Sequence, residues 1–217
     1  MVKLPFLKTN LTRICYHLVL SDILFLGAWG LTSPIMALFI TSKVFKATSI
    51  TVGTCTFLYF LVQSVFQIPI ARLLDDKTGE RDEFYCLFGG VVLSGLTAIC
   101  YMAVRDPITL YLAACMQGLG MAMYMPAWSS IFSRHLNPGK VAVAYAVDNT
   151  AQGVSTACFG LLSGIVYQFW GGNILFLIVA LLSIPAAFVI LLAPGMLIPR
   201  QKKFSLPQKK WSQETLS

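Results

Sequence analysis

The sequence predicts an all-α membrane protein whose chain crosses the bilayer six times. Of its 217 residues, 57% are hydrophobic and only 12% are charged, and the mean hydropathy is +0.73. A water-soluble domain of this size could not keep such a composition in solution. Six apolar runs are each long enough to cross a bilayer as a helix, which takes roughly 20 residues, and the basic residues gather at alternate ends of these runs.

Charged residues or Pro and Gly bound each apolar run. The predicted spans lie near residues 15–40, 50–74, 84–104, 107–133, 140–169 and 173–195. Residues 1–198 therefore form one six-helix transmembrane domain, and residues 199–217 form a basic cytoplasmic tail, expected to be disordered or to lie on anionic headgroups. The basic start of the chain lacks a signal-peptide cleavage site and is expected to be retained.

The basic residues give the spans a direction. With six alternating spans, thirteen of the 16 share one side: Lys3, Lys8, Arg13, Arg72, Lys77, Arg81, Arg134, Lys140, Arg200, Lys202, Lys203, Lys209 and Lys210. Only Lys43, Lys46 and Arg105 lie opposite. The positive-inside rule makes the first side cytoplasmic, with both termini on it, in a plasma or inner membrane. Membrane topology and lipid headgroups thus account for the net charge of +7, and we expect no nucleic-acid partner.

Polar side chains inside a bilayer are costly, so their positions indicate which helices face protein or water. Asp22, Trp29 and Ser33 share one face of the first span. The second span carries Gln63 and Gln67, whereas the third is apolar apart from small hydroxyls and is expected to face lipid.

The pattern repeats in the second half of the chain. The fourth span carries polar or aromatic residues on one face, namely Gln117, Met121, Tyr124 and Trp128, and the fifth carries Asp148, Gln152 and Ser155. The sixth offers little beyond Ser183 and Pro185, and is expected to face lipid like the third. Spans one, two, four and five are therefore expected to surround something polar.

These stripes supply the candidate site residues. We expect a substrate cavity lined by Trp29, Ser33, Gln117, Met121, Tyr124 and Trp128, and a polar interface stripe of Gln63, Gln67, Gln152 and Ser155. The alternative is that such side chains only hydrogen-bond one helix to another.

Asp22 and Asp148 each lie about 10 Å inside a span, with no Lys or Arg at the same depth. They are candidates for a proton-coupling role. For Asp148 the alternative is a structural ion pair with Arg134, Lys140 or Arg81 at the cytoplasmic end.

Enzymatic function is not expected. The six cysteines are scattered singly, and the two histidines, His17 and His135, lie near predicted helix ends without metal-ligand spacing. No glycine-rich nucleotide loop is visible, so we expect neither metal nor cofactor.

The connection between the second and third spans carries a recognisable motif. Asp76, Lys77, Gly79 and Arg81 resemble the cytoplasmic signature loop of the major facilitator superfamily, G-x-x-x-D-(R/K)-x-G-x-(R/K), although Arg72 replaces its first glycine. Gln117-Gly118-Leu119-Gly120 is similar to that family's R-x-x-Q-G-x-G motif, with Ala114 in place of the arginine.

The resemblance implies a fold and a function. The six helices would form one half of a major-facilitator fold, itself an inverted repeat of three plus three helices. The expected activity is secondary active transport of a small solute by alternating access, with protons as possible coupling ions and a second copy of the chain as partner in a parallel homodimer. The alternatives are pairing with a different half-size protein, and a membrane scaffold or chaperone that does not transport.

Overall fold

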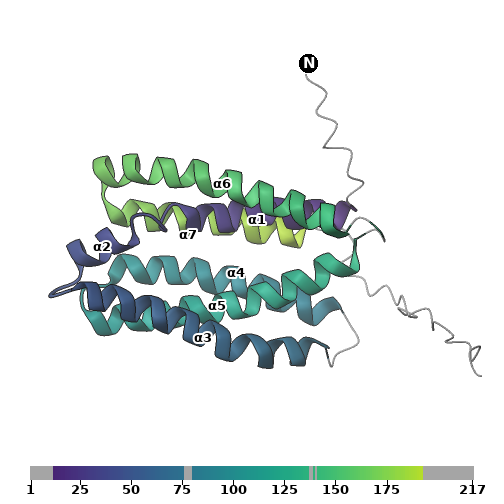
Figure 1. Ribbon diagram of the computed structural model, residues 1–217, viewed down its shortest axis with the longest axis horizontal. Coiled ribbons are helices and arrows are strands. Elements are labelled where there is room, and N and C mark those ends of the chain that lie inside the picture. Colours follow the sequence, from purple (N-terminus) through teal and green to yellow (C-terminus); the bar gives the residue numbers. More distant parts are fainter. Residues whose placement is uncertain (1–11, 76–79, 137–138, 140, 193–217) are drawn as a thin grey trace, which may run out of the picture.

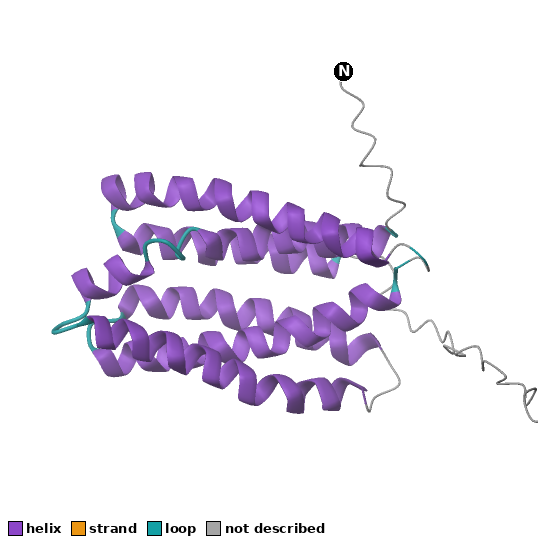
Figure 2. Cartoon of the chain, viewed as in Figure 1, coloured by secondary structure: helices purple, strands orange, loops and turns teal. Residues whose placement is uncertain are grey.

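The computed structural model describes residues 12–75, 80–136, 139 and 141–192, and the regular structure of these residues is entirely helical (Figure 1, Figure 2). The helices are α1 Arg13–Gly30, α2 Met36–Lys43, α3 Ser49–Asp75, α4 Glu80–Ala103, α5 Pro107–Arg134, α6 Val141–Trp170 and α7 Gly172–Leu191. Within this part of the chain, α3, α4, α5 and α7 are long and apolar enough to cross a membrane. α1 and α6, each with a buried aspartate, fall outside that set, so six spans stay a prediction.

The first predicted span, 15–40, is wrong as one continuous helix. The chain leaves α1 after Gly30 and starts α2 at Met36, with turns between them. Pro34 has no N–H to donate and disfavours helical geometry at Ser33. The backbone N–H groups of Leu31 and Thr32 donate instead to the carbonyls three residues earlier, a tighter helical turn than the α-helix.

The helices pack in a way that matches an internal repeat of three plus three. The first triad is α1 (with α2), α3 and α4, and the second is α5, α6 and α7. α1 packs on α6 and α7, while α5, at the corresponding place in the second triad, packs on α3 and α4. α4 and α7 contact each other, which completes a pattern that is unchanged when the two triads are exchanged. Each triad thus buries its first helix against the other triad.

The predicted cytoplasmic connections share one end of the bundle. The start of α1, the end of α3, the α5–α6 connection and the end of α7 all lie at the right in Figure 1. Of the predicted cytoplasmic basic residues, Arg13, Arg72 and Arg134 lie at these helix ends. Lys43 and Arg105 lie at the opposite helix ends, as the alternation requires. The basic tail 199–217 lies outside the described residues.

The helices with the most exposed surface in this chain are not the two that were expected to face lipid. In α3 only Thr51, Cys55 and Leu74 are buried, and α6 also exposes much of its apolar surface. α4 and α7, assigned to lipid from the sequence, are more buried because they pack on each other and on α5 and α1. A second polypeptide or lipid must therefore cover α3 and α6.

α5 begins with a side-chain cap. The Asp106 carboxylate accepts hydrogen bonds from the backbone N–H and the hydroxyl of Thr109, each at 3.0 Å, and Pro107 occupies the first turn, where its missing N–H costs nothing. These hydrogen bonds hold the pKa of the Asp106 carboxyl below its usual value.

Replacing Asp106 by alanine is expected to lower the thermal unfolding midpoint by a few degrees, because one N–H of the first turn loses its acceptor. The folded-state pKa is depressed, so the stabilisation is present above the usual aspartate pKa and is lost as the pH falls through the folded-state value. Unfolding midpoints measured across acidic pH check this. Asp106→Asn keeps an acceptor and should remove only the pH dependence; an equally pH-dependent Asp106→Asn variant would contradict the assignment.

Candidate substrate cavity and carboxyl pair

A cavity of about 400 Å³ lies among α1, α2, α3 and α5, with Tyr101 of α4 completing its wall. Its lining consists of Leu26, Trp29, Thr32, Ser33, Met36, Ile40, Cys55, Thr56, Tyr59, Tyr101, Gln117 and Met121. Four of the six residues predicted to line a substrate cavity are among them: Trp29, Ser33, Gln117 and Met121. The broken first span matters here, because the turn after α1 and the first residues of α2 form one wall.

Gly118 brings α3 close enough to form another wall. A Cβ atom at Gly118 would lie 2.4 Å from the carbonyl oxygen of Tyr59, so only glycine permits this separation of the two backbones. Small residues at such crossings let transmembrane helices approach closely. The preceding residue, Gln117, then projects its side chain into the space between α5 and its neighbours, where it lines the cavity.

Two polar atoms of the lining residues are buried without a hydrogen-bond partner among the described residues. They are the indole Nε1 of Trp29, a donor, and the amide Oε1 of Gln117, an acceptor. Buried polar atoms in folded proteins are nearly always satisfied, so these two are exceptions. Both have almost no accessible surface, so neither atom is open to the cavity in this conformation.

Asp22 and Asp148 come together between α1 and α6. Both are 1% exposed, and the side-chain nitrogen of Gln152 donates to Asp22 Oδ2 at 2.7 Å and to Asp148 Oδ2 at 2.8 Å. The hydroxyl of Tyr124 donates to the other oxygen of Asp22. Asp148 Oδ1 has no hydrogen-bond partner within the described part of the chain. One amide group thus bridges two buried carboxyl groups from α1 and α6.

Two predicted cavity residues lie elsewhere. Tyr124 and Trp128 do not line the cavity, because the Tyr124 hydroxyl is engaged by Asp22 and the Trp128 ring is stacked on Phe132, with centroids 4.5 Å apart. Both side chains are buried. α5 therefore turns one part of its predicted stripe to the cavity and the rest to the core.

The predicted interface stripe is divided. Ser155 is buried against α1, where its hydroxyl donates to the carbonyl of Ile23 at 2.8 Å, and Gln152 is held by the two aspartates. Within this chain both residues therefore bind α1, and their place in an interface stripe stays a prediction. Gln63 and Gln67 lie half-buried on the otherwise exposed α3.

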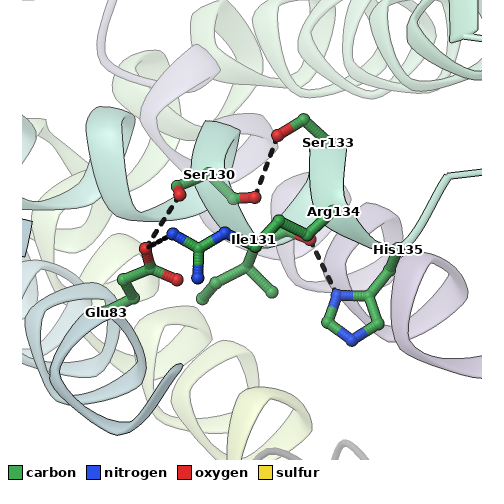
Figure 3. Close-up of polar contacts among 6 residues, drawn as sticks. All are labelled: Glu83, Ser130, Ile131, Ser133, Arg134 and His135. Atoms are coloured by element: carbon green, nitrogen blue, oxygen red, sulfur yellow. Dashed lines mark hydrogen bonds and ion pairs between the residues drawn. The ribbon is translucent and has the colours of Figure 1, made fainter. Parts of the chain in front are cut away.

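A buried acid that the sequence reasoning missed lies at the predicted cytoplasmic end of α4. Glu83 is fully buried and accepts from Arg134 at 2.5 Å and from the hydroxyl of Ser130 at 2.8 Å (Figure 3). Arg134 therefore pairs with Glu83, and the alternative ion pair between Arg134 and Asp148 is not formed. An acid directly before the third predicted span, opposite the basic end of the fourth, was the available signal.

The signature loop lies mostly outside the described residues. Asp76, Lys77 and Gly79 fall there, and Arg81 lies in the first turn of α4 with an exposed side chain. Their roles stay predictions.

A comparison with protein families finds a match over residues 18–216 to the model described as Major Facilitator Superfamily. A search of curated proteins finds no match to the chain.

Proposed function

The chain belongs to the major facilitator superfamily of membrane transporters, and from this premise we propose that it moves a small solute across the membrane by alternating access as a secondary active transporter. The cavity between α1 and α5 carries the proposal. It is lined by helices that come from both triads, and its wall includes the broken α1–α2 segment. A wall built from separate triads can open and close when one triad rocks against the other.

The carboxyl pair supports proton coupling as part of this proposal. Asp22 has a donor on each oxygen, which suits a carboxylate, whereas one oxygen of Asp148 has no partner within the described residues. Two carboxylates this close repel each other in a low-dielectric interior, so one of them holds a proton. In the proposed mechanism Asp148 carries the exchangeable proton and Gln152 links its state to Asp22 on α1.

A parallel homodimer completes the proposed transporter. α3 and α6 expose the apolar residues Phe57, Leu61, Val65, Val154 and Leu161. A two-fold axis beside these helices would cover them and place the cavities of two copies opposite each other. Gln63 and Gln67 would then supply the polar part of the interface.

Transport can be tested before the solute is identified. Purified protein in liposomes is supplied with a defined mixture of small metabolites and an inward proton gradient, and mass spectrometry identifies what accumulates. We expect selective accumulation compared with protein-free liposomes. A protein that accumulates nothing, with or without the gradient, would contradict transport and favour a scaffold role. Cross-linking between single cysteines introduced at Val65 reports the homodimer in the same preparation.

Asp148→Asn is expected to reduce gradient-driven accumulation by at least tenfold while leaving solute binding intact, because the neutral amide keeps the size of the side chain but cannot release a proton. Uptake with and without the gradient, together with binding in detergent, checks this. Thr150→Ala, on the exposed side of the same helix, serves as the control. Unchanged dependence on the gradient in Asp148→Asn would eliminate this residue as the proton site and return the role to Asp22.

A further inference from the structure

The contact between α1 and α5 is the narrowest between the two layers of the bundle. α1 packs extensively on α6 and α7, and α5 packs on α3 and α4, but α1 and α5 touch each other only at a few points (Figure 1). We call this contact the α1–α5 seam, and its members are Cys15, Asp22, Phe25, Tyr124 and the backbone of His135. Because the seam is narrow, each polar contact in it has a large share in keeping it closed.

Tyr124 closes the seam at the depth of the carboxyl pair. Its hydroxyl donates to Asp22, and its ring packs on the Phe25 ring with centroids 4.7 Å apart. The backbone of Tyr124 is packed tightly on α4, since an added Cβ atom at Gly90 would lie 2.9 Å from the Tyr124 nitrogen. The hydroxyl therefore ties α5, together with α4, to α1.

The carboxyl pair is sealed while the seam is closed. Asp22, Asp148 and Tyr124 are each 1% exposed, so water does not reach the pair in this conformation. Tyr124 covers the Asp22 side of the pair, and moving α5 away from α1 would uncover that side. Exchange of a proton with water and opening of the seam are therefore one event, in which the bond between Tyr124 and Asp22 breaks.

The closed seam holds a proton that the open seam can release. In the closed seam two carboxylates would repel each other without water to solvate them, so the pair of Asp22 and Asp148 keeps one proton. In the open seam water solvates both carboxylates, and the proton leaves the pair for that water. The closed state thus binds one proton more than the open state, and binding of a proton favours closure.

The neighbouring titratable groups do not supply an opposite charge. Those near Asp22 are Asp148 on α6 and Tyr124 on α5, and Tyr145 on α6 lies near Asp148. α7, which also packs on α1, carries no titratable residue within Gly172–Leu191. The charge of the pair is therefore set by its own proton.

From these contacts we propose that Tyr124 is the positioning residue that makes opening of the α1–α5 seam depend on the proton of the carboxyl pair. Its bond to Asp22 keeps the seam closed while the pair holds the proton, and this bond must break before the proton can leave. The inference rests on the proposed proton-coupled transport and assigns its coupling step to one side chain.

Cys15 reports on the seam without any introduced cysteine. It is 0% exposed, and its thiol donates to the His135 carbonyl at the end of α5 at 3.5 Å. Labelling of Cys15 by N-ethylmaleimide is followed by mass spectrometry in lipid nanodiscs, at mildly acidic and mildly alkaline pH. Each rate is divided by the rate for Cys15 in unfolded protein at the same pH, which removes the intrinsic pH dependence of thiol reactivity.

The wild-type protein should label slowly at acidic pH and faster at alkaline pH. Tyr124→Phe keeps the ring but loses the hydroxyl, so it should label about tenfold faster at acidic pH and lose most of the pH dependence. Asp148→Asn is neutral at any pH and should stay slow throughout. Tyr111→Phe, the same exchange elsewhere in α5, should match the wild type. General loosening of the fold would speed labelling in both seam variants, so opposite effects separate the two causes.

Three results would overturn the inference: wild-type labelling that does not change with pH, Tyr124→Phe labelling as slow as the wild type at acidic pH, and Asp148→Asn labelling as fast as Tyr124→Phe. If Tyr124→Phe does not fold, the wild type and Asp148→Asn still decide. The measurement needs no solute. Solute accumulation in liposomes alongside any of these results would leave transport standing without this coupling step, and the expected labelling without any accumulation would contradict transport alone.

Discussion

Gly118→Ala is expected to destabilise the protein by about 2–3 kcal/mol and to disrupt the cavity at the same time. The added methyl group would lie 2.4 Å from the Tyr59 carbonyl oxygen and 3.2 Å from the backbone nitrogen of Gln63. Both are backbone atoms of α3, so no side-chain rotation relieves the contact and the whole helix must shift. Because Tyr59 lines the cavity, the shift also changes its shape.

The stability loss is measured by thermal unfolding in detergent and by denaturant titration, and the cavity change by solute accumulation in liposomes. Gly53→Ala and Gly164→Ala are the controls, since a Cβ atom at either glycine meets nothing within 4 Å. Both lie in helices, where alanine is intrinsically favoured over glycine, so each should be neutral or slightly stabilising. A Gly118→Ala protein as stable as these two would show that α3 and α5 are not packed as described.

The two glycines of the Gln-Gly-x-Gly sequence let α5 pack closely on two neighbouring helices. Gln117 turns to the cavity, Gly118 meets α3, and Gly120 meets α4, where an added Cβ would lie 2.5 Å from the Ser94 hydroxyl. Within one helical turn, α5 therefore presents one functional side chain and two close helix contacts. The position of Gln117 in the cavity depends on both contacts.

Much of this arrangement could be predicted from the sequence. Helical periodicity placed Trp29 and Ser33, and likewise Gln117 and Met121, on one face of their helices, and these four residues do line one cavity. The rotation of α5 about its axis could not be predicted, because it depends on which neighbour each residue meets. Tyr124 therefore binds Asp22 in the core, although it lies on the same predicted stripe.

The break in the helix after α1 could not be predicted from the sequence either. Pro69, Pro126 and Pro185 all lie inside continuous helices, so proline alone does not reveal where a helix ends in this chain. Residues 31–35 follow Gly30 and lie next to the cavity, and the Thr32 hydroxyl donates to the carbonyl of Trp29 at 2.9 Å. The tertiary setting decides the break, and a single sequence does not display that setting.

Arg134→Ala is expected to cost about 2–4 kcal/mol of stability, because it removes the cation that neutralises a fully buried acid. Glu83 is 0% exposed, whereas the Arg134 side chain is 41% exposed and can be hydrated without its partner. Glu83→Gln should therefore cost less, since it leaves a solvated cation and keeps an oxygen for the Ser130 hydroxyl. The asymmetry between the two variants is the test of which charge is buried.

The double variant Glu83→Gln with Arg134→Ala completes a thermodynamic cycle. Removing the acid relieves the main penalty of Arg134→Ala, so the double variant should be more stable than Arg134→Ala alone. Arg72→Ala, which removes an exposed arginine near the same end of the bundle, should change stability by no more than about 0.5 kcal/mol. Equal losses for Arg134→Ala and Arg72→Ala would mean that the Glu83 charge is satisfied without Arg134, and that α4 and α5 do not depend on this ion pair for their attachment at the predicted cytoplasmic end.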